Sequence, residues 1–274
     1  MPELPEVEHV VRALRPAIVG RRILAAELKL KRTAPDISRP AFNRLLKDAL
    51  ITAVGRRGKY ILIEFESGQM LTTHLRMTGK FVALTPDDSL PPYAHVIFYL
   101  DDERRLVFCD MRQFGRMRIV PNPSKLPKEL LALAPEPLAP EFSEEYFLST
   151  VRKSHRSLKQ LLLDQTRVLG LGNIYASEAL FLAGVSPMKD ASTLSKPRAR
   201  KLYQAIRDVL QEAIDSGSTL QIDLADGNGS YFGSSERFWR VYEHEGEPCV
   251  RCRAQIKRVV QSGRSTYYCP RCQR

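Results

Sequence analysis

The two ends of this 274-residue chain carry the residues best suited to chemistry. The chain begins Met1-Pro2-Glu3-Leu4-Pro5-Glu6, and removal of Met1 would leave Pro2 with a free secondary amine beside two carboxylates. An α-amino group has an unperturbed pKa of about 8, against about 10.4 for lysine, so near neutral pH more of it carries a free lone pair. Such an amine can form an iminium ion with a sugar aldehyde, which makes the terminus a candidate nucleophile.

A purely structural explanation of the same residues is also open. Acidic residues in the first turn of a helix are favoured by the helix dipole, whatever else they do. Apolar residues recur at helical spacing and predict a helix from Pro5 to about Val19; they are Leu4, Val7, Val10, Val11 and Leu14.

At the other end, two cysteine pairs have the spacing of a metal site. Cys249 and Cys252 form one Cys-x-x-Cys pair and Cys269 and Cys272 form another, with sixteen residues between the pairs. This spacing is typical of four thiolates on one tetrahedral zinc ion, with a β-hairpin turning at Ser262-Gly263 between the pairs. A disulfide alternative is weaker, because the sequence shows no apolar signal segment and Cys109 has no evident mate. Cys109 is expected to be a small core residue of a strand.

Composition and charge restrict the class of protein. With 43% hydrophobic residues the chain can bury substantial cores, and its length predicts two domains. A formal net charge of +11 favours a polyanionic partner, and no apolar run is long enough to cross a membrane. The segment from Cys249 to the C-terminus contains no acidic residue and seven basic ones, which are Arg251, Arg253, Lys257, Arg258, Arg264, Arg271 and Arg274. This pattern predicts contact with phosphates and not the reading of a base sequence.

Six prolines between residues 121 and 140 predict a linker, because proline cannot continue a helix or a sheet ladder. Before the linker the pattern is mainly β: Tyr60–Phe65 turns at Ser67-Gly68 into Met70–Leu75, and His95–Leu100 turns into Leu106–Cys109. These hairpins are expected to be antiparallel and packed face to face.

Beyond the linker the pattern becomes helical. Asn173 and Ser195 are expected as N-caps, and Gly184 and Gly217 as C-caps. The predicted helices are 143–151, 157–166, 173–183 and 195–216.

Five motifs together carry a family resemblance that covers nearly the whole chain. They are MPELPEVE at 1–8, HLRMTGK at 74–80, RQFG at 112–115, GLGNIYASEALF at 170–181 and the two Cys-x-x-Cys pairs. In the order and register of these motifs, the chain resembles the bacterial formamidopyrimidine-DNA glycosylases. The resemblance implies an α+β multidomain fold: an N-terminal antiparallel β-sandwich with an attached helix, a helix-two-turns-helix bundle and a terminal zinc-finger hairpin. The implied boundaries are 1–122 for the catalytic β-sandwich domain, 123–141 for the linker, 142–240 for the helix-two-turns-helix DNA-binding domain and 241–274 for the zinc finger. A lesion-sensing loop is expected at about 218–238.

The resemblance implies a bifunctional glycosylase and lyase acting on oxidised purines in double-stranded DNA, notably 8-oxoguanine opposite cytosine and formamidopyrimidines. Pro2 would be the nucleophile, Glu3 the acid/base, and Glu6 a residue that orients the terminus. Lys59 would donate a proton for β-elimination and Arg264 would serve δ-elimination. Because the pKa of arginine exceeds about 12, Arg264 is interpreted chiefly as a phosphate clamp.

By the same resemblance, Met77, Arg112 and Phe114 would fill the gap left by an extruded nucleotide. The implied phosphate contacts are Lys59, His74, Asn173, Tyr242, Arg258 and Arg264, with His95 and Lys153 as further DNA contacts. Structural alternatives exist here too. Met77 and Phe114 could be core residues, His95 a hydrogen-bonded histidine of a strand, and Asn173 an N-cap that also supports a phosphate site.

Two competing functions stay open at this level. An endonuclease VIII-like enzyme would prefer oxidised pyrimidines, but Leu4, where that branch commonly has glycine, and Lys159 favour the purine enzyme. A non-catalytic zinc-ribbon DNA-binding protein would follow if Met1 were retained.

The sequence departs from the family at Glu243-His244, where a glycine and a basic residue are usual, and at Arg258, where some relatives carry lysine. We further expect one structural Zn²⁺, a monomeric protein and a cytoplasmic, chromosome-associated location.

Overall fold

The computed structural model describes residues 1–122, 126–216, 224 and 239–274, and the predicted lesion loop at about 218–238 lies outside these residues except for Leu224. The chain forms two compact units. Met1–Leu131 belongs to the first unit with Leu224, and Ala132–Ser216 belongs to the second with residues 239–274. Within the described ranges, no helix combines the length and the apolar character needed to span a membrane.

The first unit is the antiparallel β-sandwich that the sequence predicted. Its strands are β1 (Arg22–Leu28), β2 (Ala49–Arg57), β3 (Tyr60–Phe65), β4 (Met70–His74), β5 (Gly79–Leu84), β6 (Ala94–Leu100), β7 (Arg105–Asp110) and β8 (Arg116–Val120). They pair in the order β5-β7-β6-β1-β2-β3-β4-β8. β1 and β2 share only two residue pairs, and at this corner the sheet turns from one layer to the other. Apolar side chains from both layers, including Phe81, Phe108, Ile61 and Leu71, form one buried core.

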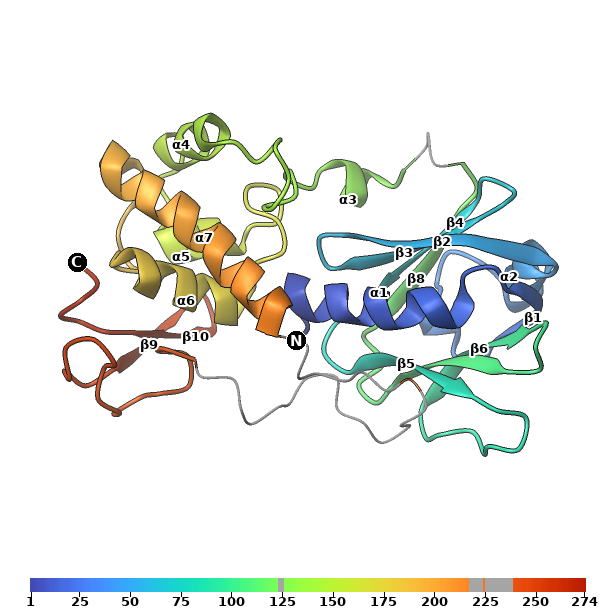
Figure 1. The fold of residues 1–274 in the computed structure, drawn as a ribbon. Helices are drawn as coiled ribbons and strands as arrows, with labels where there is room; N and C mark the ends of the chain where they lie inside the picture. Colours follow the sequence, from blue (N-terminus) through green and yellow to red (C-terminus); the bar gives the residue numbers. More distant parts are fainter. Residues whose placement is uncertain (123–125, 217–223, 225–238) are drawn as a thin grey trace. The chain divides into compact units, whose positions relative to one another are not determined.

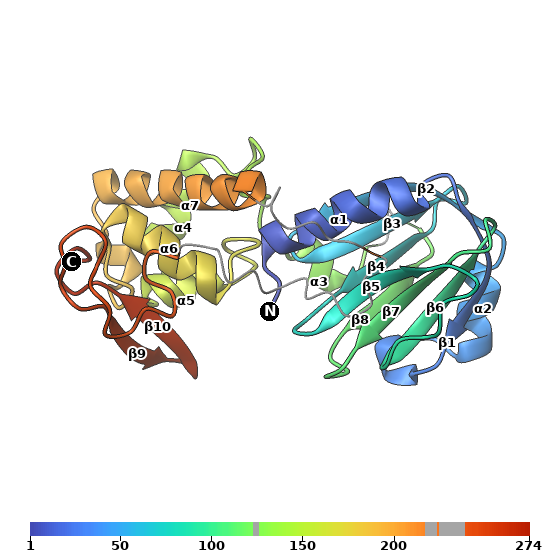
Figure 2. The same cartoon turned by 60° about the horizontal axis from the view of Figure 1, so that its bottom comes forward.

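The helix α1 (Leu4–Ile18) runs along the sandwich beside β2 and β3 (Figures 1 and 2). Val7, Val10 and Leu14 are completely buried in the core of the sandwich, so the predicted amphipathic helix is confirmed. The unit also contains two short elements for which the sequence made no prediction, the 3-10 helix η1 (Lys31–Thr33) and α2 (Arg39–Leu46). A third, α3 (Lys128–Leu131), is a single helical turn within the predicted linker at 123–141.

The second unit contains the predicted helices and the terminal hairpin. Its elements are α4 (Glu144–Arg152), α5 (Leu158–Leu163), α6 (Asn173–Ala183), the 3-10 helix η3 (Ala191–Thr193), α7 (Lys196–Ser216), β9 (Lys257–Gln261) and β10 (Arg264–Tyr268). In Figures 1 and 2, α7 runs beside α6, and the two helices are in contact.

Two details of these helices differ from the prediction. α5 ends at Leu163 and does not reach Thr166, because the Asp164 carboxylate accepts hydrogen bonds from the Thr166 backbone N–H at 3.0 Å and its hydroxyl at 2.7 Å. Such a side-chain turn competes with helical hydrogen bonding. The N-cap of α6 is Gly172 and not Asn173, whose side chain is used elsewhere. The predicted C-cap Gly184 is confirmed in the left-handed conformation, with φ of 70°.

Candidate active site and nucleic-acid interface

The N-terminus of α1 holds Pro2 and both neighbouring carboxylates in buried positions. Glu3 is the N-cap and Glu6 is the third helical residue, and together they form a capping box. Glu6 Oε2 accepts a hydrogen bond of 2.8 Å from the backbone N–H of Glu3. Glu3 is 2% and Glu6 6% exposed, so the peptide that carries Pro2 is held in one orientation. The acidic residues therefore do cap the helix, and they do so directly beside the predicted nucleophile.

An ion-pair network fixes this helix to the sandwich. The Glu8 carboxylate lies 3.0 Å from Arg12 and 3.1 Å from Arg56 of β2. Burial alone would raise the pKa of Glu8, but the hydrogen bonds and positive charges of Arg56 and Arg12 outweigh it and hold the pKa below its ordinary value. The carboxylate is therefore charged at neutral pH, and it ties the second turn of α1 to β2.

Lys59 and His74 lie on neighbouring strands of the same layer. Lys59, 5% exposed, is in the tight turn between β2 and β3. His74 ends β4 and pairs with Tyr60 directly after this turn. Burial, together with the positive charges of Arg76 and Lys59, lowers the pKa of His74 to about 3.

The His74 ring is consequently neutral at physiological pH, and its tautomer follows from one contact. Nδ1 accepts a hydrogen bond of 3.0 Å from the Arg76 backbone N–H, so the ring proton resides on Nε2. His74 can thus donate one hydrogen bond to a phosphate oxygen without carrying a charge.

Two adjacent loops present the three predicted wedge residues. Met77 lies between β4 and β5, and Arg112 and Phe114 lie between β7 and β8. Met77 is 40% and Phe114 39% exposed, so neither is the core residue that the structural alternative required. The Arg112 guanidinium lies 5.1 Å from the centre of the Phe114 ring, at cation–π distance. One surface of the first unit therefore offers an apolar side chain, an aromatic ring and a guanidinium together.

His95 occupies a different kind of position. It is 8% exposed in β6, and its Nε2 lies 2.8 Å from the backbone carbonyl oxygen of Asp110. This is the environment expected of a hydrogen-bonded strand histidine, the alternative weighed above, and contact with DNA at His95 stays a prediction. In the second unit, Lys153 is exposed as the C-cap of α4.

In the second unit, the start of α6 and the terminal hairpin meet. The Asn173 side-chain amide donates a hydrogen bond of 2.8 Å to the Ser265 carbonyl. The hairpin turns at Ser262-Gly263 as predicted, and Arg264 follows the turn with an exposed side chain. Arg258 on β9 donates to the Ser265 hydroxyl at 3.0 Å and lies 3.5 Å from the Glu245 carboxylate. Arg258 is thus partly neutralised within the protein.

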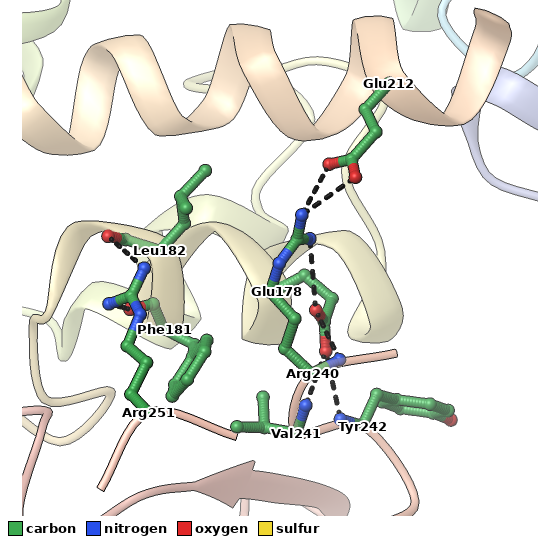
Figure 3. Close-up of polar contacts among 8 residues, drawn as sticks. All are labelled: Glu178, Phe181, Leu182, Glu212, Arg240, Val241, Tyr242 and Arg251. Carbon is green, nitrogen blue, oxygen red and sulfur yellow. Dashed lines mark hydrogen bonds and ion pairs between the residues drawn. The ribbon is translucent and has the colours of Figure 1, made fainter. Parts of the chain in front are cut away.

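A buried carboxylate on α6 organises the segment that leads to the zinc module (Figure 3). Glu178, 1% exposed, accepts hydrogen bonds from the backbone N–H groups of Arg240, Val241 and Tyr242 at 2.9, 2.9 and 3.0 Å. The Arg240 side chain bridges to Glu212 on α7 at 2.7 Å. These bonds fix the backbone of Tyr242, a predicted phosphate contact, against α6.

The same loop contains the departure from the family pattern. Glu243 is exposed and has φ of 64°, a left-handed conformation in which glycine is favoured. His244 Nδ1 lies 2.6 Å from the Glu247 carboxylate. The backbone therefore keeps a glycine-like turn at position 243 although the residue is a glutamate.

The four cysteines predicted as metal ligands converge. All four Sγ atoms lie within 4.8 Å of one another, with 3.9 Å between Cys249 and Cys272 and 3.5 Å between Cys252 and Cys269. A tetrahedral zinc ion with Zn–S bonds of about 2.3 Å requires sulfur atoms about 3.8 Å apart, so the donor set fits Zn²⁺. Cys109 is buried in β7, as expected of a core residue.

The zinc module is anchored on α6. Cys249 and Cys269 pack with Phe181, Val241 and Ile256 in one buried cluster. The Arg251 guanidinium lies 4.5 Å from the centre of the Phe181 ring and donates hydrogen bonds to the carbonyls of Phe181 and Leu182 at 3.0 and 3.3 Å (Figure 3). The hairpin is thereby held to the helix that carries Asn173.

Comparison with protein families agrees with this arrangement. Residues 1–117 match the formamidopyrimidine-DNA glycosylase N-terminal domain, residues 133–223 the H2TH domain of the same enzyme, and residues 246–274 the zinc finger found in FPG and IleRS. A formamidopyrimidine-DNA glycosylase from Pelotomaculum thermopropionicum is 44% identical over 277 aligned residues, covering 100% of this chain and 99% of the relative.

Solved structures are similar over the whole chain. A structure of MutM in complex with DNA containing carbocyclic 8-oxo-G has a TM-score of 0.90 at 34% identity and covers 100% of both chains. The Lactococcus lactis FPG (MutM) in complex with FAPY-dG containing DNA has a TM-score of 0.89 at 35% identity and covers 99% of this chain and 100% of that one. This chain belongs to the formamidopyrimidine-DNA glycosylase family.

Proposed function

We propose that this protein is a base-excision DNA repair enzyme, a bifunctional glycosylase and lyase that removes oxidised purines such as 8-oxoguanine and formamidopyrimidines. The observation that carries the proposal is the buried start of α1, where Pro2 adjoins the carboxylates of Glu3 and Glu6 in a chain of this family. A nucleophile on a rigid, capped helix end is held in place before the substrate arrives.

The chemistry begins with extrusion of the damaged nucleotide, because its glycosidic carbon cannot be attacked within the base stack. The Pro2 nitrogen, once Met1 is removed, attacks the anomeric carbon, and the glycosidic bond breaks with its electron pair leaving on the base. Glu3 acts as the acid/base that opens the sugar ring and moves protons. The result is an iminium ion between Pro2 and the sugar.

The iminium makes the neighbouring sugar C–H acidic, so loss of that proton expels the 3′ phosphate and cleaves the strand by β-elimination. Glu3 takes up the sugar proton, and Lys59 donates a proton to the departing 3′ phosphate. A second elimination expels the 5′ phosphate, with Arg264 holding a phosphate by charge-assisted hydrogen bonds.

The grip on DNA comes from both units. Met77, Arg112 and Phe114 occupy the space of the extruded nucleotide. His74 in the first unit, together with Asn173, Tyr242 and Arg258 in the second, binds the phosphate backbone, with Lys153 and His95 as further contacts. Zinc, when bound by the four cysteines, supplies the fold of the hairpin that carries Arg264. We further propose that the enzyme acts as a monomer on chromosomal DNA in the cytoplasm.

Borohydride trapping on a duplex with 8-oxoguanine opposite cytosine tests the proposal, because borohydride reduces a Schiff base to a stable amine. We expect a crosslink at Pro2 by mass spectrometry, with Met1 absent. Pro2→Gly should lose nearly all base removal while it keeps affinity for the lesion duplex.

A parallel duplex with an oxidised pyrimidine tests the endonuclease VIII-like alternative. Faster trapping on that duplex would favour this alternative. Tight binding without any crosslink in protein that lacks Met1 would favour a non-catalytic DNA-binding role.

A further inference from the structure

Asp110, the last residue of β7, is a buried carboxylate for which the proposed chemistry has no use. It is 1% exposed, and its side chain points at the bases of the two loops that carry Met77, Arg112 and Phe114. A buried carboxylate is costly unless hydrogen bonds satisfy its oxygen atoms, so its partners indicate what it does.

The partners of Asp110 come from both loops. From the first loop, the Thr78 hydroxyl donates a short hydrogen bond to Oδ1. From the second, the Arg112 backbone N–H donates to Oδ1 at 3.2 Å and the Gly115 backbone N–H donates to Oδ2 at 2.6 Å. The Thr78 hydroxyl also accepts from the Arg112 N–H at 3.1 Å, so the loops are joined directly as well.

The backbone of Asp110 is used in the same way. Its carbonyl oxygen accepts from the Gln113 N–H at 3.2 Å and lies 2.8 Å from His95 Nε2, which links the second loop to β6. The buried His95 therefore has a defined role in the sandwich, as a support for this turn.

Two glycines let the loops approach this closely. A Cβ atom at Gly79 would lie 2.5 Å from the Leu75 carbonyl oxygen and 2.9 Å from the Phe108 ring. A Cβ atom at Gly115 would lie 2.6 Å from the same ring and 3.0 Å from Asp110 Oδ2. All four distances are below those of ordinary contacts, so the packing around Phe108 and Asp110 requires glycine at both positions.

We infer that Asp110 and Thr78 are positioning residues that join the two loops into one rigid unit, so that Met77, Arg112 and Phe114 enter the duplex together. Within the described part of the chain, the side-chain hydrogen bonds of Asp110 go to loop atoms and to none of these three exposed side chains. Its effect on DNA is therefore indirect, through the loop backbones. This inference rests on the proposed function, since it concerns the step that extrudes the damaged nucleotide.

Thr78→Val tests the inference, because valine has nearly the same shape as threonine but can neither donate to Asp110 nor accept from Arg112. Thr78→Ser keeps the hydroxyl and is the matched control. Unstacking of the duplex is followed by the fluorescence of 2-aminopurine next to 8-oxoguanine, and excision is followed under single-turnover conditions. Cleavage of an abasic site in a single strand is measured in parallel, since it needs Pro2 but no wedge.

In Thr78→Val we expect unstacking and excision to slow by about ten-fold or more, because small displacements of positioned groups cost rates of that order. Cleavage of the single-stranded abasic site should stay unchanged, whereas the melting temperature should fall modestly because the buried Asp110 loses one hydrogen bond. Thr78→Ser should restore both unstacking and the melting temperature. Asp110→Asn should give at least the same selective loss, because Asp110 also binds the Arg112 and Gly115 N–H groups. The double variant should be no worse than Asp110→Asn alone, as expected if Thr78 acts through Asp110.

An equal loss in both reactions, or no loss in unstacking, would overturn the inference. Unstacking is measured without any chemistry at Pro2. Wild-type protein that unstacks the duplex but does not excise the base would therefore contradict the proposed function and leave this inference to be decided by Thr78→Val.

Discussion

The side-chain amide of Asn173 donates a hydrogen bond of 2.8 Å to the carbonyl of Ser265, a residue 92 positions further along the chain. This bond joins the first turn of α6 to β10. Ser265 directly follows Arg264, so the bond sets the position of the arginine relative to the first turn of α6. Backbone N–H groups at a helix start and an arginine side chain are both partners that a phosphate prefers.

Arg264→Ala should weaken DNA binding without lowering stability. Within residues 1–122, 126–216, 224 and 239–274, the Arg264 side chain is exposed and forms no hydrogen bond or ion pair, so alanine removes no internal polar contact. The slope of log K against log salt should become smaller by about 1, as expected when one phosphate contact is lost. Fluorescence anisotropy over a salt series measures this slope. Lys201→Ala removes the same charge from an exposed position of α7 and should leave the slope nearly unchanged. An equal change of the slope in both variants would show a general charge effect.

His74 should make the first unit less stable in mild acid. In the unfolded state the His74 ring has a pKa near 6.5, whereas in the native state its pKa is about 3. Between these two pH values only the unfolded state binds the proton, so the free energy of unfolding falls as the pH falls from 6.5 toward 3. The loss from this group approaches about 1.4 kcal/mol per pH unit. Urea unfolding at neutral and mildly acidic pH should show a smaller pH dependence in His74→Gln than in wild type. His155→Gln is the control, since the side chain of His155 is 85% exposed.

Removal of zinc should unfold the terminal module and reduce DNA affinity. Structural zinc sites contribute about 10 kcal/mol or more, comparable to the entire stability of a small domain. Anisotropy before chelation, after chelation and after addition of Zn²⁺ measures the effect, with metal content determined on the same samples. Cys109→Ala should retain one zinc per chain, because Cys109 is not among the four converging cysteines. Unchanged DNA affinity in demonstrably metal-free protein would contradict this role.

Glu243→Gly should strengthen DNA binding. The substitution removes an exposed negative charge next to Tyr242 and places glycine at a φ of 64°, where an L-residue is strained by about 1 kcal/mol. Glu243→Gln removes only the charge. Both variants should bind DNA more tightly at low salt, with a gain that shrinks as salt rises. Only Glu243→Gly should also relieve the backbone strain, which thermal unfolding of the two variants would show.

Local patterns in the sequence were enough to place most regular elements. β3 begins and ends where the apolar run and the Ser67-Gly68 turn predicted, and the β9–β10 hairpin turns at the predicted Ser262-Gly263. These elements depend on neighbouring residues, which a sequence displays directly. The four cysteines were identified for the same reason, since each pair spans a single tight turn.

Interactions between distant segments were not predictable in this way. Asn173 has the residue type of an N-cap, yet its side chain serves Ser265, and Gly172 takes the capping position. Glu178 binds three backbone N–H groups from a distant segment, and Asp110 binds the Thr78 hydroxyl from another loop. A single acidic residue at the end of a strand or within a helix has no distinguishing pattern. The assignment of Met77, Arg112 and Phe114 came from family resemblance, and periodicity alone would have placed two of them in the core.

The narrow corner of the sandwich bears on how the protein would lose activity under heat. β1 and β2 share two residue pairs, whereas β2 and β3 share six, so the two layers are held together mainly by the side chains between them and by α1. A nucleophile on a surface loop can be displaced by local fraying while the remaining fold survives. Here the segment carrying Pro2 continues into a helix whose apolar side is part of the core. Melting of the first unit should therefore displace Pro2 and the core together, and no partly frayed, folded form of this unit should lose the nucleophile alone.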